Sequence, residues 1–213
     1  MRIELNQILP LPLADQIKTT AIWKQKVIFE EGKYYQVFSA SGKGKSTFCH
    51  ILYGLREDYE GNLLFDDIDV AEFSSETWAK YRQNKIAFLF QDLRLFPELN
   101  GLENIEIKMH LGSDYKLIQA IEMARDLGVY HCLYKPVKIL SYGERQRIAL
   151  IRTLMQPFEV LVLDEPFSHL DPENIQKMIV WIDKICKKNR ATLILMGLSD
   201  DNEGLKFDQV LAL

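Results

Sequence analysis

A loop of small and basic residues at 39–47 constrains this chain more than any other feature. It follows the apolar run 34–38, which reads as a short buried strand, and precedes 48–53, whose apolar residues have the spacing of a helix. Strand, small-residue loop and helix form the context of a phosphate-binding loop, because free N–H groups and the helix dipole attract an anion there. We expect Lys45 to reach the β- and γ-phosphates of a nucleotide and the Ser46 hydroxyl to ligate Mg²⁺.

The loop departs from the usual phosphate-binding pattern at its first position. The pattern is G-x-x-x-x-G-K-[ST], and Ser39 stands where the first glycine is expected. Because that residue supports the tight turn rather than contacting the γ-phosphate, we expect serine to be tolerated. The alternative is an ordinary Gly/Ser turn between a strand and a helix. The residues expected to bind the nucleotide in this loop are Ser39, Ser41, Gly42, Lys43, Gly44, Lys45, Ser46 and Thr47.

The composition is that of an ordinary globular chain. Its 213 residues, 47% hydrophobic and 26% charged, suffice for one large domain or for one domain with a subdomain. The formal net charge of −4 argues against a protein that mainly coats nucleic acid, so no nucleic-acid partner is expected. No apolar run approaches the roughly 20 residues of a membrane span, and residues 1–6 lack the basic-then-apolar order of a signal peptide.

The three cysteines, Cys49, Cys132 and Cys186, are far apart in the sequence, and none belongs to a C-x-x-C pair. Metal-binding and redox-active cysteines usually occur as closely spaced pairs. We therefore expect buried or free thiols in a reducing compartment, without a metal-binding or catalytic role.

Strand-type and helix-type segments alternate along the chain. Continuous apolar runs are typical of strands that are buried on both faces of a sheet. Strands are expected at 26–29, 34–38, 63–65, 86–90, 160–163, 191–196 and 209–213. Helices are expected at 46–56, from Ser74 or Ser75 to 81, within 98–135, at 144–156 and at 172–188. This order predicts an α/β fold, with a mixed sheet around the phosphate loop and a mostly helical block inserted into it.

Two adjacent carboxylates follow the apolar strand at 160–163. Burying the charged Asp164 and Glu165 at that position is costly in free energy unless a cation binds there. We expect Asp164 to hold Mg²⁺, directly or through water, and Glu165 to orient and polarise an attacking water as general base. An ordinary acidic turn after a strand is the alternative.

Three other segments surround this strand in the sequence. Residues 90–97, FQDLRLFP, end a strand, residues 140–147, LSYGERQR, begin a helix, and residues 168–171, SHLD, precede another helix. The Ser141 hydroxyl and the Gly143 N–H at a helix start form a second candidate anion site.

Together with the phosphate loop, these segments resemble the nucleotide-binding domain of the ATP-binding cassette (ABC) family over nearly the whole chain. The resembling segments are 90–97 for the Q-loop, 140–147 for the signature LSGGQ-x-R, 160–166 for the Walker B strand and 168–171 for the D-loop. The resemblance implies an α/β P-loop NTPase fold in a single domain over 1–213. Within it, 1–91 and 144–213 are the expected ATPase core, and 92–143 the expected inserted α-helical subdomain.

The resemblance also implies the ligands and the catalytic residues. ATP and Mg²⁺ are the implied cofactors, and the activity is ATP hydrolysis coupled to transport. Glu165, Gln91 and Lys45 are the implied catalytic residues, and Gln91 contacts both Mg²⁺ and the attacking water in that family. Ser46, Asp164 and Gln91 are then the implied metal ligands.

A second set of residues is implied to act on a second cassette. Ser141 and Gly143 are expected to bind the γ-phosphate that the opposite subunit holds. Asp171 is also expected among the nucleotide-binding residues, in the D-loop at the dimer interface. Tyr142 replaces the first glycine of the family signature, and Glu144 replaces its glutamine. The second cassette is either an identical chain or a close paralogue.

Two departures from the family pattern bear on rate and on base selectivity. Leu198 aligns with the family's histidine that contacts the γ-phosphate, and Ser199 is the only nearby substitute donor. If that bond tightens in the transition state, its loss slows hydrolysis about tenfold to a hundredfold or more. No aromatic residue near 14–18 offers a stacking surface for adenine, and Trp23 fits a core strand better.

Three functions fit these observations. The favoured one is an ATPase subunit that powers separate transmembrane permease subunits, placed at the inner face of the cell membrane. The stretch 91–105 is most similar to the branch for lipoprotein release, macrolide export and cell division. A regulatory subunit that dimerises on ATP with little hydrolysis, and a soluble ABC ATPase of translation or DNA repair, are the alternatives. Since the chain stops about where the family core ends, no appended regulatory domain is expected.

Overall fold

The computed structural model describes residues 1–15, 20–39, 44–112, 115–198 and 204–213. Its strands are β1 (Ile3–Pro10), β2 (Lys26–Phe29), β3 (Tyr34–Phe38), β4 (Tyr59–Phe65), β5 (Ile68–Asp69), β6 (Ile86–Leu89), β7 (Val160–Asp164), β8 (Thr192–Gly197) and β9 (Gln209–Ala212). Its α-helices are α1 (Lys45–Leu52), α2 (Ser75–Asn84), α3 (Gly101–Met109), α4 (Leu117–Asp126), α5 (Tyr142–Leu154) and α6 (Pro172–Asn189). Short 3₁₀ turns include η3 (Tyr130–Cys132) and η4 (Val137–Ile139).

The strands form two sheets of different kinds. One is a parallel sheet in the order β6-β7-β8-β3-β9, and the other is an antiparallel sheet in the order β2-β1-β4-β5. The predicted α/β fold is confirmed. Both parallel and antiparallel strand pairs occur, but in separate sheets, because all pairs within one sheet are parallel and all pairs within the other are antiparallel. Parallel strands need long crossovers, and α1, α5 and α6 provide helical ones.

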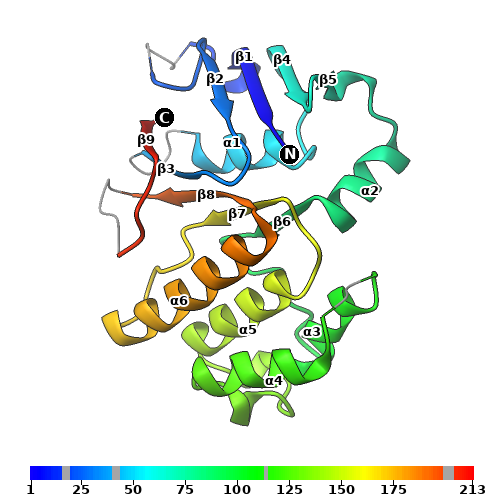
Figure 1. Cartoon of the computed structure of the whole chain (residues 1–213), viewed down its shortest axis with the longest axis vertical. Helices are drawn as coiled ribbons and strands as arrows, with labels where there is room; N and C mark the ends of the chain where they lie inside the picture. The colour runs from blue at the N-terminus through cyan, green and yellow to red at the C-terminus, as the bar shows by residue number, and fades with distance from the viewer. Residues whose placement is uncertain (16–19, 40–43, 113–114, 199–203) are drawn as a thin grey trace.

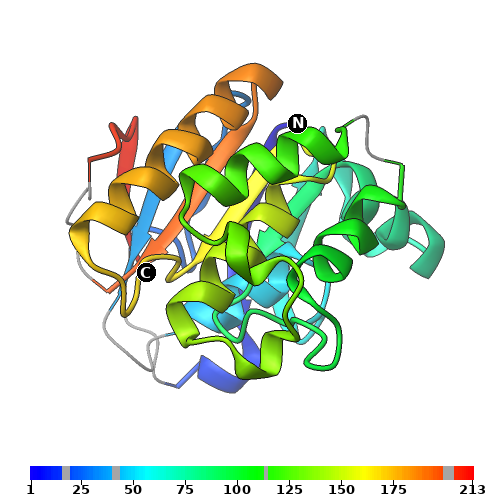
Figure 2. The ribbon, with the colours of Figure 1, turned by 90° about the horizontal axis from the view of Figure 1, so that it is seen from below.

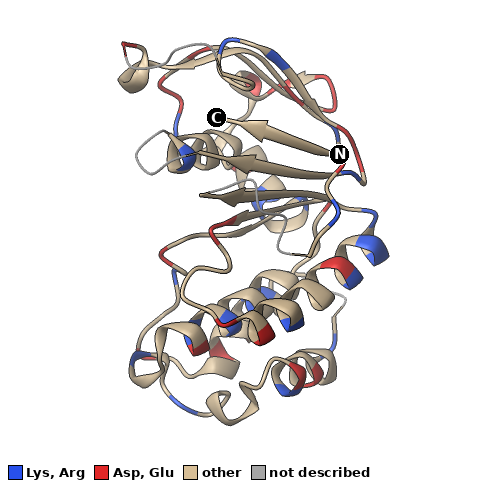
Figure 3. Cartoon of the chain, turned by 90° about the vertical axis from the view of Figure 1, so that its left-hand side faces the viewer, with Lys and Arg blue, Asp and Glu red and all other residues tan. Residues whose placement is uncertain are grey.

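The parallel sheet is buried on both faces, and β7 shows how. Val160 and Val162 belong to the core shared with the antiparallel sheet and α1, whereas Leu161 and Leu163 belong to the core shared with α5 and α6. Because side chains alternate across a strand, an unbroken apolar run supplies both cores. Asp164 is the single charged residue within the five strands of this sheet, which are almost free of charge in Figure 3.

The helices cover the parallel sheet from both sides. Helix α1 lies between the two sheets, and α5 and α6 cross the opposite face of the parallel sheet (Figures 1 and 2). Helices α3 and α4 lie beyond α5, and α3 packs on α5. The sequence interval expected to be mostly helical, 98–135, contains the two α-helices α3 and α4 and the 3₁₀ turn η3.

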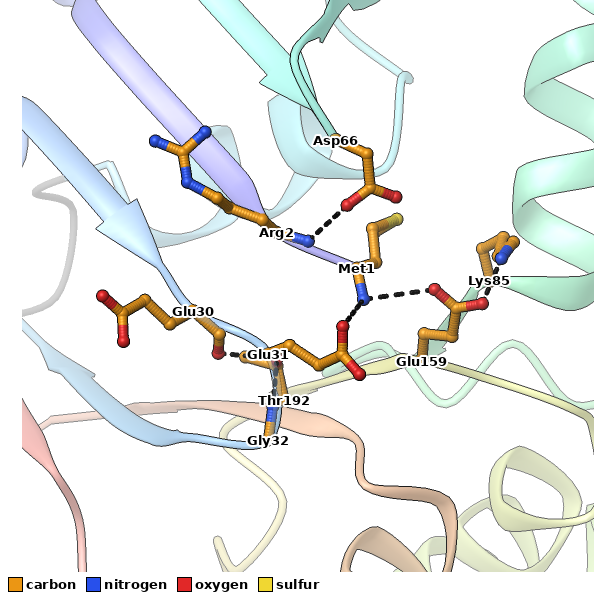
Figure 4. A network of polar contacts seen from close by, with 9 residues as sticks. All are labelled: Met1, Arg2, Glu30, Glu31, Gly32, Asp66, Lys85, Glu159 and Thr192. Atoms are coloured by element: carbon orange, nitrogen blue, oxygen red, sulfur yellow. Dashed lines mark hydrogen bonds and ion pairs between the residues drawn. The ribbon is translucent and has the colours of Figure 1, made fainter.

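Polar contacts join the two sheets at the starts of their strands. The amino group of Met1 lies 3.2 Å from carboxylate oxygens of both Glu31 and Glu159, and Glu159 also pairs with Lys85 (Figure 4). The Thr192 hydroxyl donates to the carbonyl of Glu30 over 2.9 Å. Since β1, β6, β7 and β8 all begin near this network, it fixes the antiparallel sheet against the parallel one at one edge.

Two local expectations differ from the structure. Trp23 is buried, as expected of a core residue, but it lies in a turn before β2 rather than in a strand. The helix expected over 46–56 already ends at Leu52, because a turn with Gly54 at a φ of +64° follows it. Among the helices of the described residues, none has the length and apolar character that a crossing of the bilayer requires.

Candidate functional site

The candidate site lies where four neighbouring parallel strands end. Strand β3 leads into the phosphate loop, β6 is followed by Gln91, β7 ends at Asp164, and β8 is followed by Leu198. The carboxyl ends of parallel strands meet at one edge of a sheet, and ligands of open α/β sheets bind there. Residues that are far apart in the sequence are therefore brought to one edge.

The phosphate loop is described from Gly44 onwards and at Ser39. Gly44 precedes α1 with a φ of +100°, which strains any other residue, and a Cβ there would also lie 3.0 Å from Cδ1 of Leu13, so that the leucine side chain would have to shift. Lys45 and Ser46 are in the first turn of α1, where N–H groups are unpaired within the helix. The predicted phosphate ligands Ser41, Gly42 and Lys43 lie outside the described residues.

Two predicted catalytic residues, Lys45 and Gln91, both contact the third, Glu165. Nζ of Lys45 lies 3.4 Å from Oε1 of Glu165, and Nε2 of Gln91 donates to Oε2 of the same carboxylate over 3.2 Å. Lys45 also donates to the backbone carbonyl of Ser39 over 2.8 Å. The side chains of Lys45 and Glu165 are only 7% and 13% exposed, so this ion pair is poorly screened by solvent.

The backbone turns sharply at Glu165. Its φ is +49°, in the left-handed region that non-glycine residues seldom occupy. Its N–H donates to the carbonyl of Met196 over 3.1 Å, and its own carbonyl accepts from the Ser168 hydroxyl over 3.1 Å. This turn directs the Glu165 carboxylate towards Lys45 while Asp164 remains at the end of β7. Backbone strain of this kind, at about 1–3 kcal/mol, is typical of functional sites.

Asp164 fits the role of a cation ligand. It is 5% exposed, and its Oδ1 atom is buried without a hydrogen-bond partner among the described residues. Burial, and next the nearby Glu165 carboxylate, raise the pKa of Asp164 to about 6. An ionised carboxylate in such a place lacks compensation, and a divalent ion provides it. Ser46 and Gln91, the other predicted metal ligands, carry side-chain oxygens, and an all-oxygen donor set is the kind that suits Mg²⁺.

The signature segment begins α5 through a capping box. Ser141 is the N-cap, its hydroxyl oxygen accepts from the N–H of Glu144, and the Glu144 carboxylate accepts from the N–H and the hydroxyl of Ser141 over 2.8 Å each. The bonds from Ser141 lower the pKa of Glu144 to about 2. The glutamate that replaces the family glutamine is therefore an ionised helix cap.

Gly143 and Tyr142 connect the signature segment to its neighbours. A Cβ at Gly143 would lie 3.0 Å from Cδ2 of Leu170, so this glycine permits a close approach of the segment 168–171. The Tyr142 hydroxyl donates to the carbonyl of Gln91 over 3.0 Å. Within the chain, Tyr142 thus links the start of α5 to the backbone of the Q-loop at Gln91.

Asp171 has a structural role in this chain. Its side chain is the N-cap of α6 and accepts from the N–H of Asn174 over 2.9 Å, next to Pro172 in the first helical position. The neighbouring His169 packs edge-on against the ring of Tyr142, with centroids 5.5 Å apart. The predicted contact of Asp171 with a second subunit stays a prediction.

Arg152 holds the Q-loop in place, a role that the sequence did not predict. Its guanidinium donates to the carbonyls of Leu93 and Arg94 over 2.6 and 2.7 Å, and both residues have positive φ values. Burial lowers the pKa of Arg152 to about 10. A single arginine among the apolar residues of 148–154 is the sequence signal that could have indicated a buried anchor.

Leu198 follows the end of β8 at the same edge of the sheet. Its side chain is 58% exposed and carries no hydrogen-bond donor. The alternative donor Ser199, and most of the interval 14–18 in which an adenine-stacking aromatic residue was sought, lie outside the described residues.

Comparisons with known proteins identify the relatives of this chain. The family model described as ABC transporter matches residues 24–168, which contain the phosphate loop, the Q-loop, the signature segment and both carboxylates. Among curated relatives, the thiamine import ATP-binding protein ThiQ of Escherichia coli (strain K12) is 31% identical over 173 residues, covering 80% of this chain and 72% of ThiQ. The glycine betaine/proline betaine transport system ATP-binding protein ProV of the same strain is 30% identical over 187 residues.

Solved structures share the fold. The dimeric structure of MJ0796, a bacterial ABC transporter cassette, has a TM-score of 0.84 at 23% identity and covers 99% of this chain and 94% of that chain. CbiO1 from Clostridium perfringens has a TM-score of 0.73 at 23% identity and covers 98% of this chain and 84% of that chain.

The chain therefore belongs to the ABC transporter family. It is an ATP-binding cassette of the ATPase type. It spans 46% of the length of ProV, so the cassette corresponds to less than half of that relative.

Proposed function

We propose that this cassette binds and hydrolyses ATP between two head-to-tail copies and thereby powers separate transmembrane subunits. The observation that carries the proposal is the contact of Lys45 and Gln91 with one Glu165 carboxylate, directly beside the buried Asp164. A general base, a cation for phosphate oxygens and a carboxylate for Mg²⁺ are the parts that phosphoryl transfer to water requires.

Each of these residues has a distinct part in the proposed reaction. Polyphosphate oxygens compete with Glu165 for the Lys45 ammonium, which releases the carboxylate to orient a water and accept its proton. Gln91 holds the same carboxylate through Nε2 and so restricts its direction. Asp164, Ser46 and Gln91 would hold Mg²⁺, which would neutralise part of the phosphate charge. The low exposure of Lys45, Glu165 and Asp164 strengthens the charge interactions among them.

The second nucleotide contact is proposed to come from another copy. Ser141 and Gly143 lie at the N-terminus of α5, and the N-terminus of a helix is an anion-binding feature. The MJ0796 cassette was solved as a dimer, and another structure of it is a post-hydrolysis dimer bound to ADP and Pi. These likenesses support a head-to-tail pair, either of identical chains or with a close paralogue.

The transmembrane partner is proposed to dock beside the Q-loop. Phe96 is exposed there, and the helices α3 and α4 that follow belong to the proposed helical subdomain over 92–143. ThiQ is named for thiamine import, and CbiO1 as part of the CbiONQ complex. By analogy the cassette is proposed to lie on the inner face of the membrane. The resemblance of 91–105 to the lipoprotein-release, macrolide-export and cell-division branch is proposed on that stretch alone.

A second candidate function is regulation, with ATP-driven dimerisation and little hydrolysis. Leu198 favours it, because the side chain offers no donor to a γ-phosphate at the edge where β8 ends. Glu165 and its contacts favour a working ATPase. Taken together, Leu198 and Glu165 favour a slow ATPase within a transporter.

The test is ATP hydrolysis by the purified chain, by Glu165→Gln and by Leu198→His, with Glu122→Gln on the exposed face of α4 as matched control. Turnover that Glu165→Gln removes and Glu122→Gln retains supports the ATPase. Turnover only in Leu198→His supports the regulatory function. Nucleotide affinity that is unchanged in Lys45→Ala, relative to the exposed control Lys80→Ala, would overturn both functions.

A further inference from the structure

Three potential metal ligands converge beside the first turn of α5. Nε2 of His131 lies 2.9 Å from Oε1 of Glu144, and Sγ of Cys132 lies 3.3 Å from that nitrogen and 3.4 Å from that oxygen. No other such group of His, Cys, Asp and Glu side chains occurs within the described part of the chain. The proposed nucleotide site uses none of these three residues.

The backbone that carries His131 and Cys132 is held in place by the start of α3. The N–H of Leu102 donates to the carbonyl of Leu133 over 2.8 Å, and the N–H of Gly101 donates to that of Lys135 over 3.2 Å. A Cβ on Gly101 would lie 2.8 Å from the Cys132 carbonyl oxygen, so only glycine allows this approach. The turn η3 is therefore positioned before any ion binds, which lowers the entropy cost of binding.

The third ligand is positioned independently of the other two. The Oε2 atom of Glu144 accepts both hydrogen bonds from Ser141, whereas Oε1 faces His131 and Cys132. Because the two carboxylate oxygens have separate partners, an ion on Oε1 leaves the capping box of α5 in place.

The separations suit a tetrahedral ion. Zinc lies about 2.0–2.3 Å from nitrogen, oxygen and sulfur ligands, so ligand atoms on a tetrahedron are about 3.4–3.6 Å apart. Two of the observed separations, 3.3 and 3.4 Å, match that requirement closely, and the third, 2.9 Å between His131 and Glu144, is about half an ångström too short. The largest adjustment concerns the His131 nitrogen, whose side chain is 56% exposed and has room to move.

We propose that His131, Cys132 and Glu144 bind one divalent transition-metal ion of the zinc class, with water as a fourth ligand. A thiolate and an imidazole together select such ions over Mg²⁺ and Ca²⁺, which prefer oxygen ligands alone. The exposed imidazole offers the route from solvent to the buried sulfur. This proposal departs from the absence of a metal role expected for Cys132, because the cysteine spacing contains no information about His131 and Glu144 as neighbours in space.

Protons and charges balance on binding. Without an ion, the thiol of Cys132 and a ring N–H of His131 donate to the Glu144 carboxylate. On binding, the thiol releases its proton to solvent, and the imidazole proton moves by exchange with solvent from Nε2 to Nδ1, so that Nε2 is free to ligate. One thiolate and one carboxylate then neutralise the divalent ion, and Lys135 and Arg147 are the cations close enough to influence the sulfur.

The experiment is titration of the purified, chelator-treated chain with Zn²⁺ against a chromogenic chelator, and with Co²⁺ as a spectroscopic probe. Wild type should bind one ion and show a thiolate-to-cobalt charge-transfer band. His131→Ala and Glu144→Gln should each weaken zinc binding by about a hundredfold or more, since even loss of an outer partner costs about 10- to 100-fold. Glu144→Gln is informative because glutamine preserves the capping box.

Matched controls separate this site from incidental binding. His110→Ala removes an exposed histidine elsewhere, and Cys186→Ser removes a buried thiol in α6, so both should bind zinc as wild type does. Zinc affinity that is equal in wild type and in His131→Ala, or a cobalt complex without the thiolate band, would overturn the proposal. Because His131 is exposed, its alanine variant tests the site without the risk of misfolding that Cys132→Ser carries.

The zinc proposal can be tested independently of the ATPase proposal. The titration is made without nucleotide, and Lys45→Ala should bind zinc as tightly as wild type. Loss of nucleotide binding together with retained zinc binding in that variant is the expected result. Loss of zinc binding in Lys45→Ala would contradict an independent site beside α5.

Discussion

The side-chain amide of Gln91 donates to the carboxylate of Glu165 over 3.2 Å, although 74 residues separate the two in the sequence. They meet because β6 and β7 are adjacent parallel strands whose ends reach the same edge. The contact links the Q-loop, which is proposed to face the transmembrane partner, to the proposed general base.

This relationship predicts the effect of Gln91→Ala. A hydrogen bond to a charged group contributes about 1.5–3 kcal/mol, so losing the one that orients Glu165 should lower kcat about tenfold to a hundredfold. Nucleotide affinity should change little, because Lys45 and the phosphate loop remain. Steady-state ATP hydrolysis and binding of a fluorescent nucleotide check this, with the exposed Gln25→Ala as control. Hydrolysis at the wild-type rate would contradict the orienting role.

The buried Asp164 predicts a pH-dependent stability. Its pKa is raised from 3.8 to about 6, so the folded state holds this proton more tightly than the unfolded state. The stabilisation is complete below about pH 4 and is lost as pH rises through about 6, at most about 3 kcal/mol. Asp164→Asn lacks this titration and should therefore be the more stable variant above pH 6 in the absence of Mg²⁺ and nucleotide.

Urea unfolding of wild type and Asp164→Asn between pH 4 and pH 8 measures this difference. The gap in unfolding free energy should grow with pH in favour of the asparagine variant. A gap that is independent of pH would show that Asp164 titrates normally. In wild type alone, binding of Mg²⁺ with nucleotide should strengthen as pH rises through 6, because the ion requires the ionised carboxylate.

Arg152 predicts a positioning effect on the Q-loop. Arg152→Met keeps much of the apolar stem but removes the donors to Leu93 and Arg94, and it should cost about 1–3 kcal/mol of unfolding free energy. We expect kcat to fall while the nucleotide Kd is retained, since Arg152 acts through the loop that carries Gln91. Arg152→Lys should rescue kcat only in part, because an ammonium lacks the planar guanidinium whose two nitrogens donate to the two carbonyls.

The control for Arg152 is Arg125→Met on the exposed face of α4. It removes the same charge and should leave both unfolding and hydrolysis as in wild type. Equal losses of kcat and of nucleotide affinity in Arg152→Met would indicate general damage to the fold rather than mispositioning of the loop.

The bond from Tyr142 to the Gln91 carbonyl predicts a change in local dynamics. Tyr142→Phe removes a hydrogen bond that typically contributes about 0.5–1.5 kcal/mol and retains the ring that packs on His169. Amide hydrogen exchange at 91–94 should become faster by roughly two- to tenfold, whereas Tyr134→Phe on the surface should leave it unchanged. Unchanged exchange in Tyr142→Phe would show that the bond does not hold the loop.

The sequence by itself determined the fold class and the residue types of the site. Unbroken apolar runs such as 160–163 predict buried strands, because a strand buried on both faces does not alternate between apolar and polar residues. The phosphate loop and the paired carboxylates are readable because their chemistry depends on neighbours in the sequence. Even so, the ends of helices such as α1, and the division of strands into two sheets, were decided by turns and by packing.

Only the tertiary structure decided which distant groups touch. Lys45 with Glu165, Arg152 with the Q-loop carbonyls, and Cys132 with Glu144 are contacts between separate segments, and no local periodicity encodes them. The physical reason is that strand order, not sequence order, sets which loop ends share an edge of the sheet. Burial at that edge then raises the pKa of Asp164 above the ordinary value of an aspartate, a change that the residue type alone does not predict.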